Sequence, residues 1–299
     1  MPEALALDRE GLLAWGCRER RDLPWRRTRD PWAVLVSEVM LQQTQVARVV
    51  PRYESFLRRF PSASGCAAAP LGDVIDEWRG LGYNRRAVNL HRSALVVVAE
   101  HGGHLPDDLD ALLRLPGVGP YTARAVLAFA HERPVGVLDT NVGRVLARQA
   151  GRSLRPSEAQ RTADGLVPEN DTWAWNQAML DLGATVCTAA APGCDRCPVR
   201  GSCSWRSAGL PAPDPATGSA AVAGPQSPFD GSDRQGRGRL VDALRVSSLA
   251  RRELAAAAGW PEAPERAERA AAGLVADGLA VWDGERLCLP RHPVDVAAP

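Results

Sequence analysis

The segment Leu115–Val126, with the sequence LPGVGPYTARAV, restricts the fold of this chain more than any other. Gly117 and Gly119 bracket one apolar residue, Val118, directly before the start of a predicted helix. Glycine lets the backbone turn sharply and brings N–H groups close to a ligand, and a helix N-terminus adds partial positive charge. The segment therefore predicts a hairpin between two helices, anchored in the core by Val118, that holds a phosphate.

A nucleotide-binding glycine loop is the alternative interpretation of this segment. Such loops follow a β-strand, and the P-loop ends in Gly-Lys-Ser or Gly-Lys-Thr. No strand pattern precedes Leu115, and no lysine follows it. A helix–hairpin–helix motif is therefore favoured, and contacts of this kind bind the DNA backbone without reading the base sequence.

Apolar residues recur with helical periodicity from Asp8 to about Ser204, and no alternating strand pattern competes with them. The predicted helical segments are Trp32–Val46, Val49–Phe60, Leu71–Leu81, Arg86–His101, Leu109–Leu115, Thr122–Ala130, Asn141–Ala150 and Thr172–Leu182. We expect an all-α domain over residues 1–209.

The composition changes after residue 209. Residues 210–238 are rich in Pro, Gly, Ser and Ala, which is typical of a flexible linker. Three short amphipathic segments follow it: Arg239–Arg245, Leu249–Ala258 and Glu265–Asp277. Asp283-Gly284 then lies between two apolar runs, which is a hairpin signal. Three helices and a hairpin predict a small winged-helix-like module over residues 239–299.

Four of the seven cysteines form a cluster with the spacing C-x6-C-x2-C-x5-C: Cys187, Cys194, Cys197 and Cys203. Structural zinc sites usually pair two C-x2-C knuckles, whereas this segment contains one. Iron–sulfur clusters are held by four cysteine thiolates without a need for paired knuckles. The spacing favours a [4Fe–4S] cluster over zinc, and we expect the three scattered cysteines to be packing residues.

All 36 basic residues of the chain are arginine, so no lysine side chain is available to form a Schiff base. The formal net charge of +1 does not by itself indicate a nucleic-acid partner. No apolar run approaches the ~20 residues that a membrane span needs. The N-terminus lacks the basic region of a secretion signal. We expect a monomeric, cytoplasmic protein associated with the nucleoid.

The hairpin and the cysteine cluster stand in the same order in the helix–hairpin–helix DNA glycosylases related to endonuclease III, which this chain resembles. Four segments resemble the adenine-specific, MutY-like branch: LPWRRTRDPWAVLVSEVMLQQTQV (Leu23–Val46), GLGYNRRAVNLH (Gly80–His91), VLDTNVGRVLAR (Val137–Arg148) and WNQAMLDLGATVC (Trp175–Cys187). That branch removes adenine mispaired with 8-oxoguanine or guanine, so the resemblance implies double-stranded DNA with these mispairs as the partner. Tyr121 stands where strand-cutting relatives carry a lysine, which implies a monofunctional enzyme.

Two carboxylates are the candidates for catalysis. Glu38 lies in the mostly apolar helical stretch Val34–Leu41, where burial should raise its pKa and keep a proton available for the leaving adenine. Asp139 precedes a helix, where aspartate is often only an N-cap. The resemblance makes it the carboxylate that stabilises the sugar cation, with help from Asn141 and Tyr121. Glycoside hydrolysis divides its work between two carboxylates in the same way.

Adenine has to be extruded from the duplex before it is excised. The resemblance implies that Gln43 and Tyr83 wedge into the base stack, with Leu41 and Thr44 beside them. It also implies that Trp25, Arg26 and Gln177 line the adenine pocket. The plainer interpretation makes Trp25 and Leu41 core residues, and Arg26 and Gln177 surface residues.

The sequence departs from the MutY-like pattern most strongly at its C-terminus. MutY proteins usually carry a Nudix-like domain that checks for 8-oxoguanine, and Gly238–Pro299 is too short for one. A thymine- or uracil-mismatch glycosylase of the same superfamily and a non-catalytic iron–sulfur DNA-binding protein are the alternatives. The QQT sequence after the Glu38 helix favours adenine, and the presence of both Glu38 and Asp139 favours an enzyme.

Overall fold

The computed structural model describes residues 5–219 and 228–291. Residues 220–227, which belong to the expected linker 210–238, lie outside the described residues, as do both ends of the chain. The chain divides into two compact units. Unit 1 comprises residues 1–34, 107–109 and 119–225, and unit 2 comprises residues 35–106, 110–118 and 226–299.

Unit 1 is helical. Its helices are α1 (Arg9–Glu19), α8 (Pro120–Phe129), α9 (Thr140–Ala150), α10 (Pro156–Leu166), α11 (Thr172–Asp181) and α12 (Ser204–Ser207), together with the first residues of α2 (Pro31–Leu41). Short turns accompany them: η1 (Pro24–Arg26), the π-helical turn η2 (Leu182–Val186), η3 (Cys194–Arg196) and η4 (Arg200–Ser202). The long helices predicted from periodicity are thus present here, with ends that differ by a few residues.

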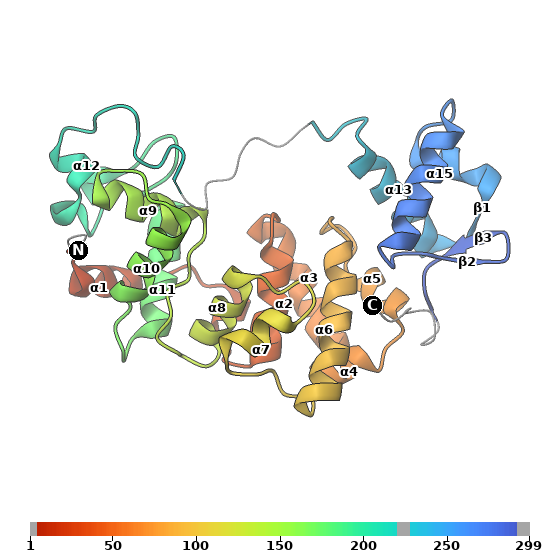
Figure 1. Cartoon of the computed structure of the whole chain (residues 1–299), viewed down its shortest axis with the longest axis horizontal. Helices are drawn as coiled ribbons and strands as arrows, with labels where there is room; N and C mark the ends of the chain where they lie inside the picture. Colours follow the sequence, from red (N-terminus) through yellow and green to blue (C-terminus); the bar gives the residue numbers. More distant parts are fainter. Residues whose placement is uncertain (1–4, 220–227, 292–299) are drawn as a thin grey trace. The chain divides into compact units, whose positions relative to one another are not determined.

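The core of unit 1 contains the apolar faces of α1, α9 and α11, which lie near the label N in Figure 1. Leu12, Leu146 and Trp175 are each no more than 2% exposed. Full burial of one large apolar side chain contributes about 1.5–3 kcal/mol to folding. This core fixes α9, which begins where the Asp139 side chain accepts a hydrogen bond from the Val142 N–H at 2.7 Å.

The N-terminal part of unit 2 is also helical. It contains most of α2, followed by α3 (Val46–Arg59), α4 (Ala63–Ala67), α5 (Leu71–Glu77), α6 (Arg85–His101) and nearly all of α7 (Leu109–Arg114). The ring of Phe56 packs edge-on against Trp78, with 6.0 Å between the ring centroids, and both side chains are fully buried. This core holds α3 and α5 together beneath the loops that follow α2 and precede α6.

The C-terminal part of unit 2 mixes helices with a small sheet. Its elements are α13 (Asp233–Val246), β1 (Leu249–Ala250), η5 (Arg251–Glu253), α14 (Leu254–Ala258), α15 (Pro264–Ala276), β2 (Val281–Asp283) and β3 (Arg286–Cys288). The strands are antiparallel in the order β1-β3-β2, so Leu287 lies opposite both Leu249 and Trp282. A hairpin with Gly284 at its turn joins β2 to β3, where the sequence predicted one.

Several contacts within unit 2 join these C-terminal elements to α5. The side chain of Arg245, only 2% exposed, donates a hydrogen bond to the Ile75 carbonyl at 2.9 Å. The Gly72 N–H donates to the Pro290 carbonyl at 2.6 Å. Gly236 of α13 faces Trp260, whose ring would lie 2.1 Å from a Cβ at that position, so only glycine permits this packing. The C-terminal elements are therefore an integral part of unit 2.

The described residues of the expected linker are held by hydrogen bonds at both of its ends. In unit 1, the Trp205 indole donates to the Pro211 carbonyl at 2.8 Å, and Asp214 forms an ion pair with Arg148 at 2.5 Å. In unit 2, α13 begins at Asp233 because the Ser232 hydroxyl accepts from the Gln235 N–H. A composition rich in Pro, Gly and Ser therefore did not prevent local order where specific side-chain partners exist.

Candidate functional site

Both units carry residues that the sequence assigned to DNA or to catalysis. Unit 1 contains Trp25, Arg26, Gly119, Tyr121, Asp139, Asn141, Gln177 and the four clustered cysteines. Unit 2 contains Glu38, Leu41, Gln43, Thr44, Tyr83, Gly117 and Val118. Each unit thus holds one of the two candidate carboxylates.

Glu38 lies in the buried part of α2. Residues 32–40 of this helix are all buried, and Glu38 is only 4% exposed. The apolar pattern of Val34–Leu41 predicted this burial, since a helix that is apolar on every face is enclosed by protein. Burying a carboxyl group in such surroundings costs free energy unless the group is hydrogen-bonded, paired or neutral.

Asp139 is the N-cap of α9, and it is also the first member of a hydrogen-bonded chain. The Asn141 amide donates to one Asp139 carboxylate oxygen at 2.7 Å, and Val142 donates to the other. Arg144 donates to the Asn141 side-chain oxygen at 2.9 Å and to the Cys187 carbonyl at 2.7 Å. A continuous path of hydrogen bonds therefore connects Asp139 with the first cysteine of the cluster.

Burial raises the pKa of Asp139 above its ordinary value. The hydrogen bonds that its carboxylate accepts from Val142 and Asn141 act in the opposite direction, because they favour the charged form. The Asp139 side chain is thus half-buried, and two donors direct its carboxylate. Sequence reasoning identified Asp139 and Asn141 but not Arg144, whose contact with Cys187 spans residues distant in the sequence.

The two predicted wedge residues have strained backbones. Gln43 has a φ of 55° and Tyr83 a φ of 46°, in the left-handed region that non-glycine residues seldom occupy. Gln43 is exposed, and Tyr83 is 42% exposed. Leu41, at the end of α2, is half-buried. Strain of this kind persists only where the surrounding structure imposes it, and it is concentrated at functional sites.

Arg86 imposes this conformation on both loops. Its buried guanidinium donates hydrogen bonds to the Thr44 hydroxyl and to six backbone carbonyls, those of Val39, Met40, Gln42, Leu81, Gly82 and Tyr83. Burial lowers its pKa to about 10. No sequence pattern indicated this role, because Arg86 and its exposed neighbour Arg85 are the same residue type at the start of α6.

The glycine hairpin has the predicted form. Gly117 has a φ of 76°, and a Cβ there would lie 2.7 Å from Asn89, so this position requires glycine. Val118 is 7% exposed and its N–H donates to the Leu115 carbonyl. Gly119 is the N-cap of α8, and Tyr121 is half-buried in the first turn of that helix.

The residues predicted for an adenine pocket are buried in unit 1. Trp25 and Gln177 are 7% and 4% exposed. Arg26 forms two hydrogen bonds to the Asp181 carboxylate, at 2.6 and 2.9 Å, and Arg21 binds the same carboxylate. Although burial opposes it, these two guanidinium groups hold the pKa of Asp181 below its ordinary value. Arg26 is therefore a buried ion-pair residue rather than a surface residue.

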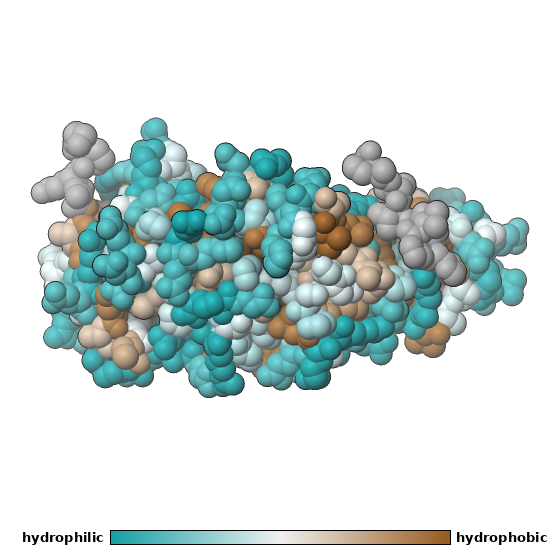
Figure 2. Space-filling model, turned by 90° about the horizontal axis from the view of Figure 1, so that it is seen from below, coloured by the Kyte–Doolittle hydropathy of each residue, from teal (hydrophilic) through white to brown (hydrophobic). Residues whose placement is uncertain are grey.

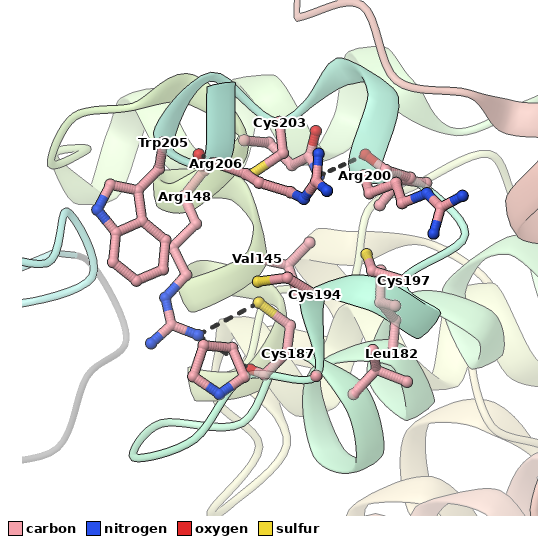
Figure 3. Close-up of a pocket in the computed structure, with 15 residues that line it drawn as sticks. Val145, Arg148, Leu182, Cys187, Cys194, Cys197, Arg200, Cys203, Trp205 and Arg206 are labelled. Carbon is pink, nitrogen blue, oxygen red and sulfur yellow. Dashed lines mark hydrogen bonds between the residues drawn. The ribbon is translucent and has the colours of Figure 1, made fainter. Parts of the chain in front are cut away.

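The four clustered cysteines line one pocket of unit 1, and Figure 3 shows their sulfur atoms around the space that they share. The pocket also contains Leu182 and Val145. All four are free thiols. Within the described residues, no three His, Cys, Asp or Glu side chains converge as ligands of a single metal ion. Four cysteine thiols that line one pocket fit the donor set of an iron–sulfur cluster, in which each thiolate binds one iron.

Arg148 connects the cysteine pocket with the expected linker. Its guanidinium donates to the Cys187 sulfur at 3.4 Å, as Figure 3 shows, and also binds the Asp214 carboxylate. Burial opposes the charge of Arg148, but the Asp214 and Cys187 contacts raise its pKa. Burial also raises the pKa of the Cys197 thiol to about 11, so without a bound cation this thiol is protonated at neutral pH. The donor set therefore fits a positively charged iron–sulfur core.

The surface seen in Figure 2 is mostly hydrophilic, with hydrophobic residues in small scattered groups. Among the helices of residues 5–219 and 228–291, none combines the length and apolar character that a bilayer crossing requires.

Comparison with known proteins places this geometry in a family. The description "HhH-GPD superfamily base excision DNA repair protein" matches residues 36–169. The chain is 43% identical over 273 residues to an adenine DNA glycosylase from Mycolicibacterium smegmatis, covering 90% of each protein. It is 42% identical over 217 residues to the adenine DNA glycosylase of Homo sapiens, covering 66% of this chain and 39% of the human protein.

Two solved structures are similar to this one. A thermostable thymine-DNA glycosylase has a TM-score of 0.62 and 30% identity, covering 67% of this chain and 94% of that protein. Endonuclease III in a trapped covalent intermediate with DNA has a TM-score of 0.59 and 24% identity, covering 68% of this chain and 95% of that one, and shows the fold. The mostly helical fold expected from the sequence is thereby confirmed. The chain belongs to the adenine DNA glycosylases, a family of DNA N-glycosylases within the HhH-GPD superfamily of base excision repair proteins.

Proposed function

We propose that this protein excises adenine mispaired with 8-oxoguanine or guanine in double-stranded DNA, by hydrolysis and without cutting the strand. The observation that carries the proposal is the burial of Glu38, a carboxyl group only 4% exposed on an apolar helix, in a chain that belongs to the adenine DNA glycosylases. We further propose that it acts as a monomer in the nucleoid.

In the proposed reaction, Glu38 donates a proton to the leaving adenine as the bond between the base and C1′ of the sugar breaks. The electron pair of that bond departs with the base, and the sugar becomes an oxocarbenium ion. The Asp139 carboxylate, oriented by Asn141 and Val142, stabilises this cation. Water then adds to C1′ and gives its proton to the ionised Glu38 carboxylate, which leaves an abasic site and restores the acid.

The rest of the site positions DNA in this proposal. The Gly117–Gly119 hairpin binds a backbone phosphate, with N–H groups at the start of α8. Gln43 and Tyr83, with Leu41 and Thr44 beside them, enter the base stack when adenine leaves it. Trp25, Arg26 and Gln177 enclose the extruded base, with Arg26 fixed by Asp181. Tyr121 lies beside the sugar.

The absence of lysine supports a monofunctional reaction. A lyase that cuts the strand through a Schiff base needs a side-chain amine, and none of the 299 residues provides one. The product strand should therefore stay intact until it is treated with alkali.

We propose that Cys187, Cys194, Cys197 and Cys203 hold a [4Fe–4S] cluster. When bound, the cluster supplies the cationic iron centres that keep these thiols deprotonated and the loop folded. We also propose that residues 239–299 form a winged-helix-like module. The alignment with the M. smegmatis protein covers 90% of this chain, which is more than residues 1–238 alone. The similarity to that adenine DNA glycosylase therefore extends into residues 239–299.

Single-turnover excision from A:8-oxoG, A:G, T:G and U:G duplexes tests the function. We expect adenine release from the first two, and release of thymine or uracil instead would favour the mismatch-glycosylase alternative. Glu38→Gln should slow adenine release by 10²–10⁴-fold, the usual contribution of a general acid. Glu54→Gln, at an exposed position of α3, is the matched control and should retain the wild-type rate.

The cluster has its own test. We expect purified protein to be brown and to contain iron and acid-labile sulfide in equal amounts. Colourless protein with one zinc ion per chain would contradict the assignment.

A further inference from the structure

The segment 135–137 of unit 1 lies shortly before the candidate carboxylate Asp139, and its backbone is held largely by side chains. The Val137 N–H donates to the Asn176 side-chain oxygen at 2.8 Å, and the Asn176 amide donates to the Val135 carbonyl at 3.1 Å. Asn176 belongs to α11 and is only 2% exposed. One buried side chain therefore pairs with the backbone at both ends of the segment, as a neighbouring strand would in a sheet.

Gly136, in the middle of this segment, is held by a second helix, α10. Its N–H donates to the Asp164 carboxylate at 2.9 Å, and its carbonyl accepts from the Gln160 amide at 2.9 Å. A Cβ on Gly136 would lie 2.5 Å from the Ala163 carbonyl carbon, so only glycine allows so close an approach to α10. Three side chains, here called the backbone clamp, thus hold the segment against two helices: Asn176, Asp164 and Gln160.

The backbone clamp is connected to α8, the helix that begins at the glycine hairpin. Arg124 of α8 donates at 2.6 Å to the same Asp164 oxygen that accepts from the Gly136 N–H. Gln160 donates to that oxygen as well, at 3.1 Å. Hydrogen bonds therefore link the helix of the predicted phosphate-binding hairpin to the segment that leads to Asp139.

Asn176 also has a particular place on α11. The residue after it, Gln177, is predicted to contact adenine, and Asp181 of the same helix binds Arg26 of the predicted adenine pocket. Helix α11 therefore carries predicted contacts to the base together with the side chain that holds the approach to Asp139. One residue separates the held segment from Asp139, and so short a connection leaves that residue little freedom to move independently.

We propose that the backbone clamp positions Asp139 for excision, so that Asn176, Asp164 and Gln160 are positioning residues of the reaction. The inference rests on the proposed function for the reaction itself. The clamp fixes the chain before Asp139, and the first turn of α9 donates two hydrogen bonds to the Asp139 carboxylate. A displacement of about 1 Å at a catalytic group can slow a reaction about a hundredfold, so this support has a kinetic consequence.

A purely structural role of the backbone clamp is the alternative. Buried polar groups are hydrogen-bonded in any stable fold. Loss of a clamp residue would then lower the stability of the protein and leave the excision rate of each folded molecule unchanged. Measurements on protein that remains folded separate the two roles.

The first test compares full-length Asn176→Ala with the wild type, below the unfolding temperature of both. Single-turnover adenine release from an A:8-oxoG duplex should slow by about 10–100-fold, because Asp139 is no longer held in place. Binding to a duplex with a tetrahydrofuran abasic analogue should keep the wild-type Kd, since the substituted side chain is buried. Hydrogen–deuterium exchange should become faster over residues 135–145, where the N–H groups of Val137 and Val142 lose protection.

Thr172→Val is the matched control on the same helix. Thr172 is also 2% exposed, and its hydroxyl donates to the Pro168 carbonyl at 3.4 Å, outside the held segment. The substitution removes a buried side-chain hydrogen bond of α11, and it should leave both the excision rate and the exchange over residues 135–145 unchanged.

A second pair of variants tests the clamp at Asp164, whose side chain is 35% exposed, so that folding is at less risk. Asp164→Asn keeps an oxygen that accepts from the Gly136 N–H, whereas Asp164→Ala does not, and both remove the charge that faces Arg124. Excision should stay near the wild-type rate in Asp164→Asn and become about tenfold slower in Asp164→Ala. Equal rates in these two variants would contradict the proposal.

Three other results would overturn it: wild-type excision in Asn176→Ala, unchanged exchange over residues 135–145 in that variant, or the same loss of excision in Thr172→Val. The exchange measurement does not depend on activity. If the wild-type protein releases no adenine, the proposed function fails, and faster exchange in Asn176→Ala alone would still show that the backbone clamp holds Asp139 and the start of α9.

Discussion

Both units bury arginine, and Arg86 of unit 2 is satisfied in a different way from Arg26 and Arg148 of unit 1. In unit 1, Arg26 is paired with Asp181 and Arg148 with Asp214, so each guanidinium meets a carboxylate. In unit 2, Arg86 donates to six backbone carbonyls and a hydroxyl, and its pKa is lowered to about 10. The carboxylate-paired Arg148 has instead a raised pKa.

This difference separates two functions of a buried cation. A carboxylate partner offsets the charge of an arginine and fixes its side chain. Asp181 does so for Arg26, which is predicted to line the adenine pocket. Carbonyl partners fix the backbone, because a single guanidinium presents five N–H donors in a rigid plane. Arg86 thereby holds Gln43 and Tyr83 in conformations that their own residue types disfavour.

The largest expected effect comes from breaking the buried pair in unit 1. Asp181→Asn leaves Arg26 buried with its charge no longer offset, which should lower the free energy of unfolding by about 3–5 kcal/mol. Urea unfolding measures this loss. Asp22→Asn is the control, because the Asp22–Arg27 pair is exposed on both sides, and its unfolding curve should match that of the wild type.

The same pair predicts a pH dependence. Since the pKa of Asp181 is lowered in the folded protein, its stabilisation is complete above its unfolded pKa and is lost as the pH falls through the folded value. Asp181→Asn should remove this component of acid destabilisation. An equal loss of stability on acidification in both proteins would contradict the assigned pair.

Arg86→Gln should produce the next largest effect. Several buried carbonyls lose their donor, at about 1–3 kcal/mol for each group left unsatisfied, so we expect a loss of roughly 3 kcal/mol. Excision should also decline, since the Gln43 and Tyr83 loops are released. Arg85→Gln removes the same charge one residue earlier, from a side chain 63% exposed, and should cost under about 1 kcal/mol. An equal loss of unfolding free energy in the two variants would show that Arg86 does not organise the loops.

Asp214→Asn should have a smaller effect on stability, about 1 kcal/mol, because its side chain is 27% exposed and solvent screens the pair. Its larger consequence is expected at the cysteine pocket, where Arg148 loses the partner that aligns it with Cys187. We therefore expect faster loss of iron to a chelator, measured by visible absorbance. Glu158→Gln, which breaks an ion pair of Arg152, should lose iron at the wild-type rate.

The smallest effect concerns the pH dependence of excision. Asp139 must be ionised in the proposed mechanism, and burial raises its pKa, so the rate should fall with decreasing pH at values above the ordinary aspartate pKa of about 4. Asn141→Ala removes a hydrogen bond that favours the charged form of Asp139, and should move this fall in rate to higher pH. Single-turnover rates against pH measure the shift, with Thr140→Ala as the control. If the rate of Asn141→Ala fell at a lower pH than that of the wild type, this account of Asp139 would be wrong.

Local patterns predicted several elements of this protein, but the predicted helix Trp32–Val46 ends at Leu41, and α3 begins at Val46 after a short loop. The segment Asn141–Ala150 became α9 with one additional residue, and Thr172–Leu182 became α11, because helical periodicity and capping residues act within one turn. The Gly117 hairpin was predictable for the same reason, as only glycine accepts its backbone conformation. The roles assigned to the site residues remain predictions.

The amino-acid sequence specifies the residue types that any mechanism can use: a chain without lysine, four clustered cysteines, an acid in an apolar helix and a glycine hairpin. Packing between elements selects which of the 36 arginines are buried and which groups each of them binds. The decisive contacts join residues that are distant along the chain. Examples are the hydrogen bonds of Arg144 to the Cys187 carbonyl and of Arg234 to the Tyr83 hydroxyl. Such contacts depend on packing between elements, which leaves no periodic trace in the sequence.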